Sequence, residues 1–165
     1  MQDGSAQIGR GAGPSSVVTG VAVLDHLLVQ LASAGGFEIR LEVAPDEPEA
    51  EVGTAGATLG KAFRPLLARA AAARRGFGVT PAAEALAMVV VEVSEKALVV
   101  SNADLTSSRA GGLQTDLVAA FLDGLAEEAG LTIHVRLIEG QDSQHVLDAI
   151  FKGLGVALAR ACADA

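Results

Sequence analysis

The chain is poor in the residues that build several common classes of protein. Its single cysteine, Cys162, excludes a disulfide framework within the chain and a zinc site built from several cysteines. Tryptophan and tyrosine are absent and only five phenylalanines occur among 165 residues, which predicts a core of aliphatic, alanine and glycine residues. Cys162 itself is expected to be a small core residue near a helix end.

Positive charge and long apolar runs are also scarce. Twelve Lys and Arg residues against twenty Asp and Glu residues give a net charge of −8. This balance argues against sequence-independent binding of nucleic acid, which needs clustered cations. No uncharged apolar run reaches the roughly 18 residues of a membrane-spanning helix, and no secretory signal pattern opens the chain. The sequence therefore predicts a soluble cytoplasmic protein of about one domain.

The spacing of apolar residues predicts both helices and strands. Residues 1–14 are rich in glycine and are expected to form a flexible tail, followed by a single domain over 15–165. The predicted strands are 16–19, 37–43, 87–93, 97–101 and 131–137, with the third and fourth joined as a tight hairpin. The predicted helices are 21–34, 52–75, 114–129 and 143–163, the second kinked or broken at Pro65.

The order helix, glycine, strand, loop, helix occurs twice. A shift of 94 residues superposes Leu28, Gly36 and Ile39 on identical residues at 122, 130 and 133. We therefore expect two repeated halves, at about 15–80 and 97–165. Their element order predicts an α+β fold, a two-layer sandwich with helices on one face of a sheet.

Polar stripes lie opposite the apolar faces of two predicted helices. In the last helix His145, Asp148 and Lys152 share one side, and a His-x-x-Asp pair can place an imidazole and a carboxylate on one metal ion. In the first helix His26 and Gln30 form a similar stripe. A solvated helix face explains the same spacing, so the residues alone leave both interpretations open.

Three cations stand out by their context and could together bind a phosphate group: Arg74, Arg109 and Lys152. Spacing alone does not say whether they converge. The chain contains no Walker loop, no dinucleotide-binding glycine motif, no nucleophile elbow and no His-Glu-x-x-His motif.

Five segments in order resemble one enzyme family. They are Thr19–Leu31 with its Asp25-His26 pair, Pro81–Leu86, Arg109–Val118, Leu131–Arg136 and Gly140–Lys152. Together they are similar to the motifs of imidazoleglycerol-phosphate dehydratase, in register over nearly the whole chain.

The resemblance implies a ribosomal-protein-S5-domain-2-like fold, a shell of 24 subunits with active sites between subunits, and dehydration of imidazole glycerol phosphate. In the family two manganese ions hold the imidazole ring. The resemblance places Arg74, Arg109 and Lys152 on phosphate-binding positions, and Gln30 and Glu84 on other active-site positions.

The chain departs from the family at its metal ligands. One set of ligand positions, grouped by the repeat, keeps residues able to bind manganese: His26, Glu49, His145 and Asp148. The mirror set has largely lost them: Ala120, Gln144, Ala50 and Gly53. We therefore expect one manganese ion or none in each site.

Two further family features have no counterpart here. The family's first strand, with its R-x-T-x-E-T motif, is not found in residues 1–13, and a serine-bearing C-terminal tail is missing.

Two functions remain open. One is a dehydratase-like enzyme of histidine biosynthesis with an impaired or single-metal site. The other is a non-catalytic relative that keeps the fold and assembly as a phosphate-binding or structural protein.

Overall fold

The computed structural model describes residues 4–69, 74–103, 109–110 and 113–163, with side chains outside 104–116. The strands are β1 (Gly4–Arg10), β2 (Ser16–Val18), β3 (Phe37–Val43), β4 (Arg75–Ala82), β5 (Ala85–Val93), β6 (Leu98–Ser101), β7 (Arg109–Ala110), β8 (Leu113–Gln114) and β9 (Leu131–Glu139). The helices are α1 (Ala22–Gly35), α2 (Pro48–Arg69), α3 (Thr115–Ala129) and α4 (Ser143–Ala161).

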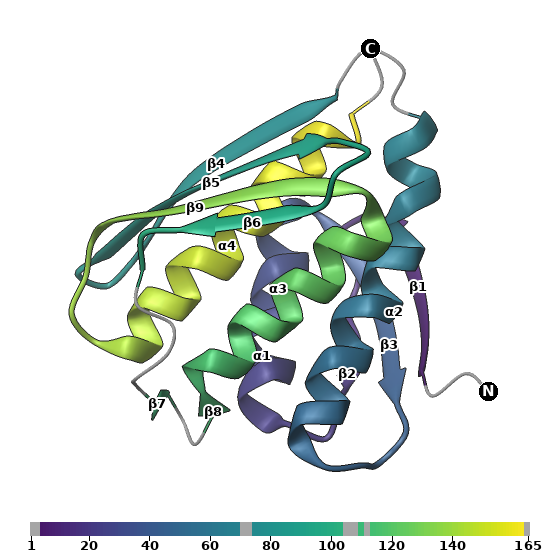
Figure 1. The fold of residues 1–165 in the computed structure, drawn as a ribbon, viewed down its shortest axis with the longest axis horizontal. Helices are drawn as coiled ribbons and strands as arrows, with labels where there is room; N and C mark the ends of the chain where they lie inside the picture. The colour runs from purple at the N-terminus through teal and green to yellow at the C-terminus, as the bar shows by residue number, and fades with distance from the viewer. Residues whose placement is uncertain (1–3, 70–73, 104–108, 111–112, 164–165) are drawn as a thin grey trace.

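The two halves repeat one strand topology (Figure 1). In the first half β3 pairs antiparallel with β1 on one side and parallel with β2 on the other. In the second half β9 pairs in the same way with β5 and β6, and β4 is added outside β5. The repeat expected from the sequence is present, but its halves begin at β1 and β5 rather than at about residues 15 and 97, and β4 belongs to the second sheet.

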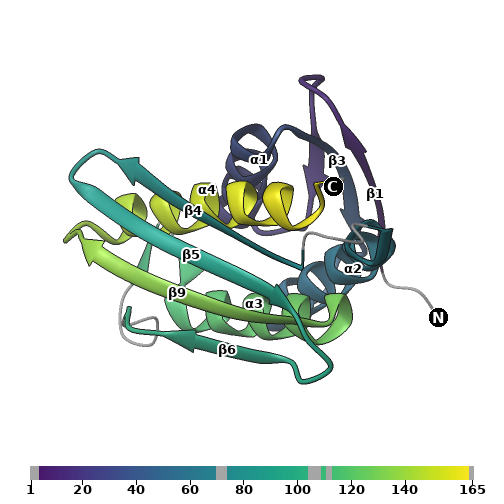
Figure 2. The ribbon, with the colours of Figure 1, turned by 90° about the horizontal axis from the view of Figure 1, so that it is seen from above.

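The helices lie between the two sheets (Figure 2). Helix α1 packs on α4 and α2 packs on α3, so each contact joins a helix of one half to a helix of the other. Each half is a two-layer sandwich of a sheet and two helices, and the halves stack through their helices. The predicted α+β class is confirmed, but the single two-layer sandwich expected from the sequence is replaced by two such sandwiches, one for each half. One aliphatic cluster, with four buried phenylalanines, runs through both halves.

Glycines at the helix contacts follow the repeat. A Cβ atom added to Gly155 of α4 would lie 2.1 Å from the carbonyl oxygen of Leu31 in α1. A Cβ atom added to Gly60 of α2 would lie 2.8 Å from the carbonyl oxygen of Leu125 in α3. These four residues are related by the same shifts of 94 and 95 that relate the halves in sequence. The α2–α3 contact therefore has the register of the α4–α1 contact.

The expectation of a flexible tail over residues 1–14 is wrong for Gly4–Arg10, which form β1. This strand pairs with all seven residues of β3, and its half-buried Ala6 and Ile8 pack against the core. Glycine-rich composition concealed the strand because only these two inward positions are apolar.

The predicted helix over 52–75 also differs from the structure. Helix α2 begins earlier, at Pro48, with Glu49 and Glu51 in its first turn, and it ends at Arg69 with Pro65 inside it. Proline suits a first helical position because its missing N–H has no partner there. The strand β4 was not predicted because its inward residues Gly76 and Gly78 meet the backbone of α4 and carry no apolar side chain.

The predicted hairpin of residues 87–93 and 97–101 is wrong. Strand β9 lies between β5 and β6 and pairs with both. Alternation of apolar residues defines which face of a strand is buried but not which strand is its neighbour, so the sequence could not reveal this insertion. In the described part of the chain, no helix is both long and apolar enough to cross a membrane. The cytoplasmic location stays a prediction.

Candidate functional site

The contact between α1 and α4 brings two predicted metal ligands together. The Nε2 atom of His26 lies 3.4 Å from Oδ1 of Asp148. The side-chain amide nitrogen of Gln30 lies 3.1 Å from the same His26 atom, and that of Gln144 donates to Asp148 Oδ1 at 2.9 Å. His26 is half exposed, whereas the Asp148 side chain is only 15% exposed. The polar stripes of both helices therefore face one another at the rim of a helix contact.

These two atoms form an arrangement that suits a shared cation. Asp148 Oδ1 accepts from the Gln144 amide, and in the tautomer that carries its proton on Nδ1, His26 presents Nε2 as a second acceptor to the Gln30 amide. Two acceptors that face one another attract a proton or a metal ion between them. Imidazole nitrogen and carboxylate oxygen are both suitable ligands for manganese. The donor set fits a metal ion, although it supplies only two ligands.

His145 lies at the start of α4 and is held by Glu84. Its Nδ1 atom lies 2.5 Å from Oε1 of Glu84, which sits in the turn between β4 and β5. The other Glu84 oxygen accepts the backbone N–H groups of Gln141 and Asp142, each at 3.1 Å. Ala83 adopts a left-handed conformation, with φ of 52°, and this turn directs Glu84 toward the helix.

This network shifts the pKa values of both partners. The backbone N–H of Gln141, followed by His145 and the backbone N–H of Asp142, lowers the pKa of Glu84 from 4.5 to about 2. The hydrogen bond to Glu84 raises the pKa of His145 above its usual 6.5. Glu84 is therefore a carboxylate at neutral pH and binds the Nδ1 proton of His145. A carboxylate that binds one ring nitrogen in this way commonly orients the other nitrogen toward a metal.

The structure does not bring all four predicted metal ligands together in one chain. Glu49 lies in the first turn of α2, which packs on α3 rather than on α1. Among the described residues, no group of three or more His, Cys, Asp or Glu side chains is positioned to hold a metal ion.

The opposite helix pair lacks the donors of this contact. The α2–α3 contact has the same glycine register, so Ala50 and Gly53 of α2 occupy the positions equivalent to His145 and Asp148. Ala120 of α3 corresponds to His26. Alanine and glycine side chains have no ligand atom for a metal.

The predicted phosphate-binding residues do not meet within the chain. Lys152 donates to the carbonyl oxygen of Pro81 at 2.6 Å, near the end of β4. Arg74 is exposed and directly precedes β4. Arg74 and Pro81 are seven positions apart along extended chain, or about 23 Å at 3.3 Å per residue. The side chain of Arg109 lies outside the described residues. Convergence of Arg74 and Lys152 on one phosphate would therefore require two subunits.

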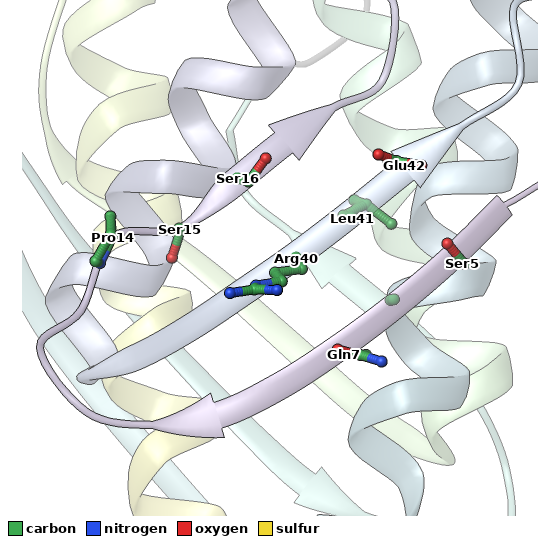
Figure 3. Close-up of a pocket in the computed structure, with 9 residues that line it drawn as sticks. Ser5, Gln7, Pro14, Ser15, Ser16, Arg40, Leu41 and Glu42 are labelled. Atoms are coloured by element: carbon green, nitrogen blue, oxygen red, sulfur yellow. The ribbon is translucent and has the colours of Figure 1, made fainter.

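A groove of about 550 Å³ lies elsewhere, on the outer face of the sheet of the first half. Its lining includes Ser5 and Gln7 of β1, Ser16 of β2, and Arg40 and Glu42 of β3 (Figure 3). None of the predicted site residues lines it. Two contacts that fix the predicted site could not be recognised from the sequence: that of Gln144 with Asp148, and that of the backbone N–H groups of Gln141 and Asp142 with Glu84.

The fold and these side chains define a duplicated α+β protein with a histidine–carboxylate site at one of two equivalent helix contacts. The family imidazoleglycerol-phosphate dehydratase matches residues 19–158. The dehydratase of Methanocella arvoryzae is 36% identical over 157 residues, which cover 93% of this chain and 81% of that protein. The dehydratase of Magnetococcus marinus is 34% identical over 157 residues, which cover 93% and 79%.

Solved structures agree with these relatives. The crystal structure of imidazoleglycerol-phosphate dehydratase from Staphylococcus aureus has a TM-score of 0.85 and 30% identity, and the match covers 98% of this chain and 94% of that one. The Pyrococcus furiosus enzyme, in complex with (S)-C348, has a TM-score of 0.84 and 26% identity, with 100% and 92% covered. The chain belongs to the imidazoleglycerol-phosphate dehydratase family.

Proposed function

We propose that this chain binds an imidazole-bearing phosphate ester at a single metal site and dehydrates imidazole glycerol phosphate slowly. The observation that supports this function is the difference between the two helix contacts. His26 and Asp148 face one another across α1 and α4, whereas Ala50, Gly53 and Ala120 occupy the equivalent positions of α2 and α3.

The residues of the chain have distinct tasks in this proposal. His26, His145 and Asp148 bind the metal, and Glu49 of another subunit completes the ligand set. Manganese bound there would act as a Lewis acid that stabilises charge on the imidazole ring of the substrate. Glu84 holds the Nδ1 proton of His145 and thereby leaves Nε2 free as a ligand.

Assembly supplies the rest of the site. Lys152 of one subunit and Arg74 of another would bind the phosphate, since about 23 Å of strand separates Arg74 from Pro81, whose carbonyl oxygen accepts from Lys152. Arg109 would join them, and Gln30 would orient His26 through the contact described above. The proposal therefore includes a homo-oligomer, of up to 24 subunits, with the faces that carry His26 and His145 at subunit contacts.

The alternative is a non-catalytic relative that keeps the fold and a phosphate site. It is favoured by the scarcity of ligands, since the described residues bring only two of the four proposed metal ligands within contact. One metal ion cannot hold both nitrogens of an imidazole ring as two ions do. We therefore expect dehydration at least about a hundredfold slower than in a two-metal enzyme, which corresponds to about 2.7 kcal/mol of lost transition-state stabilisation.

Metal content and activity together test the proposal. We expect purified protein to bind one manganese ion per chain and to dehydrate imidazole glycerol phosphate slowly. Asp148→Asn should abolish manganese binding, whereas Asp123→Asn, the same change on the exposed side of α3, should leave it intact. Two ions per chain, or a rate typical of the family, would show the proposal to be wrong. Absence of both metal and activity would support the non-catalytic alternative.

A further inference from the structure

Backbone groups on the outer edge of β1 pair with no other strand among the described residues. The N–H of Gly11 donates to the carbonyl oxygen of Gly36 at 3.0 Å, which continues the β1–β3 register by one residue. Hydrogen-bonded residues alternate along an antiparallel pair, so Gly9, Gln7 and Ser5 direct their N–H and C=O groups toward β3. The intervening residues direct theirs away from the sheet: Gly4, Ala6, Ile8 and Arg10.

The second half of the molecule shows what covers the equivalent edge. Strand β5 occupies the position of β1, and β4 pairs antiparallel along its outer side over eight residues. In the first half the sheet has three strands, and β1 is its edge. Among the described residues, no strand pairs with the outer side of β1.

This edge has few of the features that usually prevent strand addition, and its one charged residue, Arg10, lies at the end of the strand. Natural edge strands are protected by charged side chains, proline, bulges or shortness. The edge strand β4 contains Arg75 and Pro81, and β2 and β6 have only three and four residues. Residues 4–9 of β1 contain no charge and no proline, and the β1–β3 register runs without a shift.

We propose that β1 pairs antiparallel with β1 of a second copy of this chain, across a twofold axis at Gln7. In this register Ala6 lies opposite Ile8 of the other copy and Gly4 lies opposite Arg10. Each pair matches a small residue with a large one, and all four outward residues form hydrogen-bonded pairs. Such self-complementary contacts are typical of twofold homodimers.

The pairing joins two three-stranded sheets into one continuous sheet. Gln7 and Ser5 lie on its outer face beside Arg40, so the two polar grooves would lie next to each other across the axis (Figure 3). This contact involves none of the residues of the proposed metal site. It can therefore be tested whether or not the chain is an enzyme.

Cysteine cross-linking distinguishes this register from others. On a twofold axis the two Cα atoms of residue 7 would form a non-hydrogen-bonded pair about 4.5 Å apart, within the range of a disulfide. Gln7→Cys, in a Cys162→Ala background, should therefore give a covalent dimer under mild oxidation. Ser5→Cys is the matched control, because its two copies would lie about 13 Å apart and should not cross-link. Cross-linking of Ser5→Cys, or none with Gln7→Cys, would overturn the proposed pairing.

Proline at Ala6 tests the hydrogen bonds themselves. Ala6→Pro removes an N–H group that points away from β3, so the β1–β3 ladder is kept. We expect a dimer dissociation constant raised at least about tenfold in sedimentation equilibrium, because one bond is lost on each side of the axis. An unchanged constant, with native circular dichroism, would contradict the proposal. A raised constant without cross-linking of Gln7→Cys would mean that another strand, such as β4 of a second copy, occupies the edge, and would also contradict it.

Discussion

Replacing Gly155 with alanine should weaken the protein through a single methyl group. The added Cβ atom would lie 2.1 Å from the carbonyl oxygen and 2.9 Å from the carbonyl carbon of Leu31. Ordinary contacts are at least about 3.4 Å, so α1 and α4 must separate by roughly 1 Å. Both groups are backbone and cannot rotate away. This overpacking should cost about 3 kcal/mol, the upper part of the usual range.

Helix propensity offsets part of this cost. Alanine is better than glycine in a helix interior by about 1 kcal/mol, so the net loss of unfolding free energy should be about 2 kcal/mol. Urea denaturation followed by circular dichroism measures this loss directly. The separation should also move His26 away from Asp148 and weaken manganese binding.

Gly53→Ala provides the matched control in another helix. No atom lies within 4 Å of a Cβ atom added there, so only the propensity gain remains. We expect this variant to be more stable than the natural protein by about 1 kcal/mol. If Gly155→Ala were as stable as Gly53→Ala, the argument from close helix contact would be refuted.

Three further predictions concern side-chain hydrogen bonds. Asp142→Ala removes the side chain that caps α4 and should cost about 1 kcal/mol of unfolding free energy; an unchanged urea midpoint would contradict this. Thr80→Val removes a 2.7 Å bond to the carbonyl oxygen of Ala149 and should cost a similar amount, whereas Thr132→Val, which loses a 3.4 Å bond, should cost less. The third concerns pH. The His145–Glu84 pair should stabilise the fold fully between about pH 4.5 and 6.5. The Glu84 contribution should fall as pH drops toward 2, and that of His145 should fall as pH rises through its elevated pKa. In proton NMR, Glu84→Gln should return the pKa of His145 toward 6.5, and an unshifted value would refute the assigned cause.

Regular alternation and helical periodicity predicted much of the fold. The strand Phe37–Val43 was predicted with its observed bounds, because four apolar residues face the core and three charged residues face solvent. Strand β4 reverses this pattern. Gly76 and Gly78 face inward, where α4 leaves no room for side chains, while Phe77 and Val79 are about half exposed. Such a strand cannot be recognised until its neighbouring helix is known.

The candidate site was predictable to a similar extent. Motifs identified His26, His145, Asp148 and Glu84 individually. The repeat predicted that His26 and Asp148 belong to the same site. Contact between His145 and Glu84 could not be predicted, since they are 61 residues apart and meet through a left-handed turn. The position of Glu49, on the helix that packs against α3, depends on how the halves stack rather than on any local pattern.

The crossed pairing of helices, α1 with α4 and α2 with α3, bears on how the two helix contacts came to differ. A chain that contained only one half would leave a helical face exposed and would need an identical copy to cover it. In such a pair, twofold symmetry would make the two contacts identical, so any substitution would alter both. Joining the halves in one chain removes that constraint. One contact can then keep its histidine and aspartate while the other loses its donors to alanine and glycine.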